Sequence, residues 1–377
     1  MRSSIWQFCP NIFPQVLTND RIEYKGKSLK TSYLVDLMHT FIVRKYIHKR
    51  KEMNLWSVIL RRKYGTFYNN YVDWLIDHKI IQLKKKWKSG AGGKSKLYRL
   101  TLDVEDKVTR YLNTDKFLLR KINHFKKDEE KKLSPIYQQM VDDLKHVKLN
   151  YDKALASLEL ELETSLISKA SFFKNKISID AIKNEAFYNT KDEYGRLHTN
   201  YTNLKKSIRN NFLTIDDKEI EWLDIKNCQP KLLAKLILEK EKTLSPELEK
   251  FIQAVRDNTF YSSFSHLDIG KSDIKKLVFQ IFFGKNKQNK KNLIFKEVWP
   301  AVWHWIVRLK REKKNHKHLS HMLQNMESDL IYNKICQTIK NVDSSIILFT
   351  VHDGLFFAKE NLHIVKPIFD KFENEII

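Results

Sequence analysis

The chain has 377 residues, of which 42% are hydrophobic, so it is long enough for several domains with buried cores. Lysine and arginine number 69 against 45 acidic residues, and this excess of 24 positive charges favours a polyanionic partner, nucleic acid before others. No apolar run reaches the roughly 18 residues of a membrane span and no secretory signal is evident, so we expect a cytoplasmic protein without a membrane partner. A lysine-rich composition also fits an AT-biased genome, and charge alone does not decide between these explanations.

The first hundred residues predict a small helical module with a basic hairpin. Residues 1 to about 30 look irregular, and helices are expected at 31–51, 54–63 and 66–78. Two alternating strands follow at 80–102 around a glycine-rich tip at 90–93. This order resembles a winged helix, which implies contacts between the hairpin and phosphates. The lysines that would make them are Lys86, Lys88, Lys94 and Lys96. A solvated basic hairpin is the alternative.

Residues 104–182 are highly charged and predict two long antiparallel helices with a break near Pro135. A plain helical linker or a coiled coil would give the same pattern.

Two aspartates stand where apolar strands end. Asp224 follows a short apolar run and precedes a helix pattern over 228–240, a place where aspartate is ordinarily a turn or cap residue. Asp353 lies between two apolar strands at 344–358, where an Asp-Gly pair is also the usual hairpin turn. Neither residue alone indicates catalysis.

Four segments, at 193–213, 219–240, 271–285 and 344–358, change this interpretation of the two aspartates. In their order along the chain, residues 104–377 resemble the family A DNA polymerases and the single-subunit phage RNA polymerases. Gly195, Arg196 and Leu197, followed by Asn203 and Leu204, match an early palm segment of the family. The resemblance implies that Arg196 and Asn203 contact the primer–template duplex. It also implies that Asp224 and Asp353 are the two catalytic carboxylates, with His352 beside the nucleotide.

The segment 271–285 is similar to the fingers helix of the family. Steps of four residues place cations and rings near one helix face. The resemblance implies that the cations bind the triphosphate, that Lys275 neutralises or protonates the departing pyrophosphate, and that the rings shape the base pocket. The matching residues are Lys271, Lys275, Phe279, Phe283 and Gly284. A core helix with exposed lysines is the alternative. Gln324 matches a late palm glutamine that reaches the primer end.

Two neighbouring carboxylates repel by about 3 kcal/mol at about 5 Å and an effective dielectric near 20, so the pair calls for cations. The resemblance implies two Mg²⁺ ions, with Mn²⁺ as a substitute, held by Asp224, Asp353 and the backbone carbonyl of Ile225. Gln229, five residues after the first acid, stands where DNA polymerases of the family hold a bulky glutamate and the RNA polymerases hold glycine. It therefore favours deoxynucleotides.

The expected fold is α+β, a right-hand polymerase with an antiparallel palm sheet and helical thumb and fingers. We expect a winged-helix-like module at 1–103, a thumb at 104–190, palm at 191–240 and 321–377, and fingers at 241–320. The expected function is a compact DNA polymerase without proofreading, serving a phage or mobile element with primer–template DNA, nucleoside triphosphates and replication accessory proteins as partners. An RNA polymerase or primase on the same palm is one alternative, and a DNA-binding replication initiator with an inactive palm is another.

Overall fold

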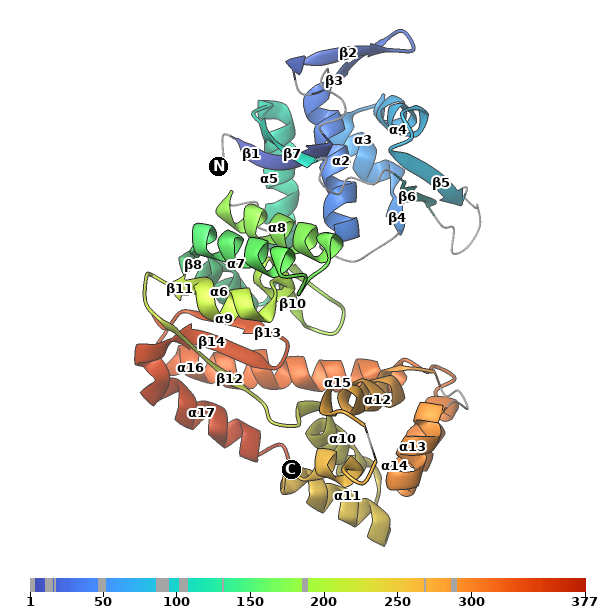
Figure 1. Ribbon diagram of the computed structural model, residues 1–377, viewed down its shortest axis with the longest axis vertical. Helices are drawn as coiled ribbons and strands as arrows, with labels where there is room; N and C mark the ends of the chain where they lie inside the picture. The colour runs from blue at the N-terminus through green and yellow to red at the C-terminus, as the bar shows by residue number, and fades with distance from the viewer. Residues whose placement is uncertain are drawn as a thin grey trace. The chain divides into compact units, whose positions relative to one another are not determined.

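The computed structural model is an α+β protein whose strands form small sheets of two or three strands (Figure 1). It divides into two compact units. Unit 1 comprises Met1–Ser134, Lys148–Asn189 and Thr199–Thr214, and unit 2 comprises Pro135–Val147, Thr190–His198 and Ile215–Ile377. The structure describes residues 4–10, 16, 18–46, 52–85, 95–101, 108–130, 132–184, 189–267, 269–285 and 290–377.

Between residues 31 and 100, the described part of unit 1 contains three helices followed by a pair of antiparallel strands. Helix α2 (Thr31–Tyr46), strand β4 (Glu52–Leu55), helix α3 (Ser57–Tyr64) and helix α4 (Tyr68–Asp77) precede strands β5 (Ile81–Lys85) and β6 (Lys96–Leu100). The sheet order is β4-β6-β5, with both neighbours antiparallel to β6. The buried face of α2, including Leu34, Met38 and Phe41, belongs to the core of this unit. The predicted helix order and hairpin strands are therefore present.

Most of the described N-terminal residues form strands, so the prediction that this segment is irregular was wrong for them. Strand β1 (Ile5–Pro10) pairs with β7 (Val108–Asn113), and β2 (Arg21–Tyr24) pairs with β3 (Lys27–Lys30). A buried polar network supports β1, because Gln7 donates to Asp36 at 2.7 Å and accepts from Asn113 at 2.8 Å. Lys63 lies 2.6 Å from the same Asp36 carboxylate, and these paired charges hold the pKa of Asp36 below its usual range despite burial.

Residues 104–182 do not form the two predicted long helices, because the described part of 104–191 contains several shorter elements. Its described elements are β7, α5 (Lys116–Glu130), α6 (Pro135–Asp143), a 3-10 turn η1 (Leu144–His146), β8 (Val147–Leu149), α7 (Tyr151–Glu163), α8 (Lys169–Lys183) and β9 (Asn189–Lys191). Helices α7 and α8 pack on each other, while α6 belongs to unit 2. Pro135 starts α6 as predicted. Strand β10 (Leu197–Thr199), turn η2 (Tyr201–Asn203), α9 (Lys206–Phe212) and β11 (Leu213–Ile215) follow.

Unit 2 is organised around a three-stranded antiparallel sheet. Its strands are β12 (Ile220–Asp224), β13 (Leu348–Val351) and β14 (Gly354–Ala358), in the order β12-β14-β13. Every residue of β13 and β14 is buried. Figure 1 shows the sheet beside helix α17 (Leu362–Asn374) and beside the long helix that runs from α15 (His318–Ser328) through the π-helical segment η4 (Asp329–Cys336) into α16 (Gln337–Val342).

A buried ion pair secures strand β13. The Lys340 ammonium lies 2.7 Å from the Asp143 carboxylate, which also accepts from the Leu348 amide at 2.8 Å. Both side chains are nearly inaccessible, so removing either partner would leave an uncompensated buried charge.

The remaining helices lie between β12 and α15 in the sequence. They are α10 (Cys228–Lys240), α11 (Pro246–Arg256), the 3-10 turn η3 (Phe260–Phe264), α12 (Lys271–Phe283), α13 (Lys290–Val298) and α14 (Pro300–Glu312). Helix α15 packs against α10, α12 and α14, and so connects this helical part to the sheet region. The turn η5 (Lys359–Asn361) precedes α17. Among the described residues, no helix combines the length and the apolar character needed to cross a bilayer.

Candidate active site

The sheet of unit 2 brings the two predicted carboxylates together. Asp224 is the last residue of β12 and is paired with Gly354, the first residue of β14. A carboxylate oxygen of Asp224 lies 3.8 Å from the point where a Cβ on Gly354 would stand. Asp353 immediately precedes that glycine, in the two-residue turn between β13 and β14. Residues 129 positions apart in the sequence thus share one end of the sheet (353 minus 224).

The turn that carries Asp353 has an unusual backbone. His352 has a φ of 57°, in the left-handed region that most residues avoid. Gly354 faces the Val351 carbonyl so closely that a Cβ would lie 3.3 Å from its oxygen. The exposed His352 and the half-buried Asp353 are therefore held by a tight hairpin.

A third carboxylate, Glu327 of α15, acts on Asp353. Burial, then Asp224, then Glu327 raise the pKa of Asp353 to about 7. The thiol of Cys228 experiences the same groups, because burial and the charges of Asp353, Glu327 and Asp224 raise its pKa. Three carboxylates therefore act on one another at this site. Glu327 is not among the residues that the sequence predicts.

Glu327 accepts hydrogen bonds from Arg196 and Gln229, two residues that the sequence predicts for the site. Arg196 donates to both carboxylate oxygens, at 2.9 and 2.8 Å, and the Gln229 amide donates to the same group. Glu327 is 2% exposed and its pKa is raised by burial, which the neighbouring guanidinium opposes. Gln229 is 6% exposed, and among the described residues its Oε1 has no hydrogen-bond partner. Arg196 and Gln229 thus belong to one buried polar cluster.

Gly195 allows this cluster to form. Its φ of +86° suits glycine, and a Cβ there would stand 2.9 Å from the Cβ of Ser328. Tyr137 donates to the Gly195 carbonyl at 2.7 Å. The turn that delivers Arg196 therefore packs directly on the end of α15.

Helix α12 presents the predicted cation and rings on an accessible face. Lys275 is exposed, Phe279 is 39% exposed, and the Phe279 and Phe283 rings stack with centroids 5.4 Å apart. Ile274, Val278 and Phe282 are buried on the opposite side. The side chain of Lys271, the first residue of the helix, lies outside the described part.

Tyr261 of η3 was not selected from the sequence. Burial raises its pKa to about 12, and the charge of Asp353 contributes to that increase. The Lys275 ammonium lies 5.9 Å from the centre of the Tyr261 ring. The Tyr261 ring therefore lies near the Lys275 ammonium, and Asp353 is close enough for its charge to act on the phenol. A lone tyrosine in a short 3-10 turn has no sequence pattern that could have revealed this.

The end of α12 is held by a buried lysine from α14. Lys310 is 3% exposed and donates to the carbonyls of Ile281 and Gly284 at 2.6 and 2.8 Å. Burial lowers its pKa from 10.5 to about 8. Gly284 itself tolerates no side chain, because a Cβ would stand 2.4 Å from the Gln280 carbonyl oxygen.

Replacing Lys310 with methionine is expected to remove a rise in stability with pH. The ammonium loses its proton near pH 8 in the folded chain but only near 10.5 when unfolded, so wild-type stability should rise between these values by about 3 kcal/mol. Denaturant unfolding at about pH 7 and about pH 10 measures the difference. Lys313→Met, at an exposed position just after α14, should keep the rise. An unchanged pH dependence in Lys310→Met would contradict this account.

The other predicted residues fall in several places. Ile225 follows Asp224 with its side chain buried, and Gln324 lies half-buried one turn before Glu327. Asn203 and the exposed Lys96 belong to unit 1. Lys86, Lys88 and Lys94 lie outside the described residues. Within the described ranges, no group of three or more His, Cys, Asp or Glu side chains is placed to hold a metal ion.

No protein-family model and no curated protein matches this chain.

Proposed function

We propose that the chain is a template-dependent DNA polymerase that uses the end of the β12-β14-β13 sheet as its catalytic centre. The observation that carries the proposal is the pairing of Asp224 with Gly354. This pairing brings the carboxylates of Asp224 and Asp353 near each other at one end of an antiparallel sheet. The resemblance of four ordered segments to family A polymerases supports it. In this proposal the sheet is the palm and α12 belongs to the fingers.

Asp224 and Asp353 have the donor chemistry that Mg²⁺ requires. Mg²⁺ prefers oxygen ligands and is commonly bound by one or two carboxylates together with substrate phosphates, so a third protein carboxylate is not needed. Burial, and then repulsion from Asp224 and Glu327, raise the pKa of Asp353, and a bound cation would relieve the repulsion. When bound, the ion supplies charge neutralisation at the reacting phosphate. The Ile225 carbonyl is the further ligand in this proposal.

The chain's own residues would position the triphosphate. Phosphoryl transfer depends mainly on orientation and on stabilising charge. Lys275 offers an exposed ammonium for the phosphates and for the departing pyrophosphate, while Phe279 and Phe283 offer stacked rings for base and sugar. Lys271, His352 and Gly284 complete the proposed nucleotide site. Tyr261, whose ring lies near the Lys275 ammonium and whose phenol the charge of Asp353 influences, joins this set as a positioning residue.

Arg196 enters the proposal in a modified role. Its guanidinium is paired with Glu327, so it first supports the buried cluster that holds Gln229. Contact with the primer–template duplex remains the proposed role of Asn203 and Gln324. Arg196 would share it through the guanidinium N–H groups that do not bind Glu327. Gln229 supplies bulk beside the carboxylates, which favours deoxynucleotides over ribonucleotides.

Unit 1 contributes the proposed nucleic-acid-binding module. The order α2, β4, α3, α4, β5, β6 with a β4-β6-β5 sheet supports its description as winged-helix-like. The exposed lysines of its hairpin strands, including Lys84, Lys85 and Lys96, favour phosphate contacts. Replication of a phage or mobile element is the setting that such a compact chain suits.

Primer extension tests the proposed activity. With Mg²⁺ and a primed DNA template, wild-type protein is expected to add deoxynucleotides in the order of the template, and to add nothing when the metal is chelated or the template is omitted. Parallel reactions with ribonucleotides, with and without primer, separate a DNA polymerase from an RNA polymerase or primase. DNA binding without any nucleotide addition would contradict the polymerase proposal and favour a replication initiator.

A further inference from the structure

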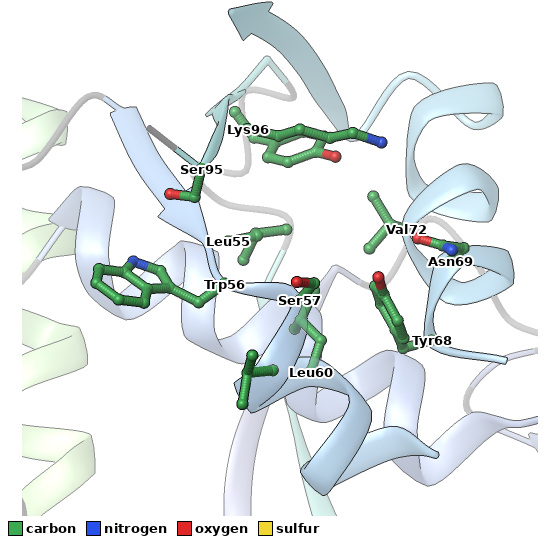
Figure 2. Close-up of a pocket in the computed structure, with 11 residues that line it drawn as sticks. Leu55, Trp56, Ser57, Leu60, Tyr68, Asn69, Val72, Ser95 and Lys96 are labelled. Carbon is green, nitrogen blue, oxygen red and sulfur yellow. The ribbon is translucent and has the colours of Figure 1, made fainter. Parts of the chain in front are cut away.

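A cavity of about 430 Å³ opens in unit 1 between the start of α3, the start of α4 and strand β6. We call it the Trp56 pocket, after the aromatic residue that precedes α3. Figure 2 shows Tyr68, Asn69 and Val72 on one side, Trp56 and Ser95 on the other, and Leu55 and Ser57 between them. All of its lining residues belong to unit 1.

The floor of the Trp56 pocket is part of the unit 1 core. Leu55, Leu60, Val72 and Tyr98 line it and are all 9% exposed or less. Their positions are set by core packing, so the apolar surface of the pocket is formed before any ligand binds.

The rim, in contrast, exposes large apolar groups. Trp56 is 62% exposed and Val58 is 68% exposed. Contact of these apolar side chains with water is unfavourable, so a ligand that covered them would gain hydrophobic free energy. The indole of Trp56 provides a broad π surface at the mouth of the pocket. A flat, partly apolar ligand could cover it by stacking.

Several polar groups face this pocket with unused hydrogen-bonding capacity. The side chains of Ser57, Tyr68, Asn69 and Ser95 line it, and within the described residues none of them hydrogen-bonds to another part of the chain. Together they offer hydroxyls that donate or accept and an amide that does both. Such a set matches the mixed donor and acceptor edge of a nucleobase.

The charge near the pocket matches a phosphate. Lys96 contributes an ammonium to the lining, and Lys84, Lys85 and Arg99 are exposed on the same pair of strands. Asp73, one turn after Asn69 on α4, lies near Tyr98 and helps to raise the pKa of that phenol. Asp73 itself does not line the pocket, whereas the Lys96 cation does and suits a phosphate of the backbone.

We propose that the Trp56 pocket binds one unpaired nucleotide of the strand that unit 1 engages. The base rests on the apolar floor and against Trp56, its polar edge meets Ser57 and Asn69, and its phosphate meets Lys96. The net charge of +24 favours nucleic acid over an apolar acidic peptide as the occupant. The pocket does not depend on chemistry at Asp224 and Asp353, which belong to unit 2.

Three fluorescently labelled DNA probes test the proposal with the full chain: a perfect duplex, the same duplex with one bulged nucleotide, and a single strand. Wild type is expected to bind the bulged duplex and the single strand more tightly than the perfect duplex. Trp56→Ala should weaken binding of these two probes about tenfold and leave the perfect duplex within about twofold, since stacking of one base is lost. Asn69→Leu should act in the same direction.

Matched variants separate the pocket from general effects. Phe117→Ala removes another exposed aromatic ring of unit 1, 65% exposed on α5, and should change no probe selectively. Lys96→Ala should weaken the bulged probe more than Lys84→Ala, which removes an exposed charge from the partner strand β5. Equal affinity of wild type for the three probes, or equal losses in Trp56→Ala and Phe117→Ala, would overturn the proposal and leave the exposed indole to a protein partner. Because binding is measured without nucleotide addition, failure of the polymerase proposal would not affect this outcome.

Discussion

Asp353→Asn is expected to abolish nucleotide addition, by at least about 1000-fold in rate, which corresponds to about 4 kcal/mol of transition-state stabilisation. The change removes one of the two carboxylates that meet at the end of the sheet while keeping nearly the same volume. Single-turnover primer extension measures the loss, and affinity for primer–template DNA should stay within about twofold. An active Asp353→Asn variant would rule out the mechanism proposed here.

The stability of this variant distinguishes lost chemistry from lost folding. Asp353 has a pKa raised to about 7 in the folded chain against 3.8 ordinarily, so its ionisation disfavours the folded state as pH rises through this interval. An asparagine is free of that cost, and the unfolding temperature of Asp353→Asn at about pH 8 should equal or exceed that of wild type. Asp370→Asn makes the same chemical change on helix α17, next to Lys366, and should keep full activity.

Local patterns predicted the elements that carry the proposed site. The apolar run before Asp224 forms β12, the two runs around Asp353 form β13 and β14, and residues 271–283 form one helix. Each pattern records which side chains must be buried, and each element is short and bounded by turn residues. The meeting of Asp224 and Asp353 was anticipated only through the order of the segments, because no local rule specifies which strands pair.

Features that depend on distant partners escaped prediction. The sequence of β1 gives no strand signal of its own, because its pairing partner β7 lies about a hundred residues later in the chain. The pattern over 104–182 predicts two long helices because charged residues with scattered leucines suit helices, whereas the structure interrupts them with β7, β8 and turns. The sequence around Glu327 does not distinguish it from other helical glutamates. Only the structure shows that Arg196 and Gln229 donate hydrogen bonds to it.

Gln229→Gly is expected to admit ribonucleotides. The side chain occupies a buried position at the start of α10, and its amide nitrogen is directed at Glu327, which Arg196 holds from the other side. This contact fixes the side chain in one orientation, with its bulk beside Glu327, the carboxylate that also acts on Asp353. Glycine removes the bulk, and the ratio of deoxynucleotide to ribonucleotide incorporation should fall by about 10- to 100-fold in single-nucleotide extension.

A second substitution tells steric exclusion from hydrogen bonding at this position. Gln229→Met keeps the length of the side chain but cannot donate to Glu327, so a purely steric gate should survive in it, whereas discrimination by a fixed amide should weaken. Glycine in the first turn of a helix costs about 1 kcal/mol, and Glu327 keeps its bidentate Arg196 partner in both variants, so neither change should unfold the chain. If Gln229→Gly and wild type discriminate equally, sugar selection resides in another residue. Tyr261, whose pKa is raised by burial and then by the charge of Asp353, is the first to replace.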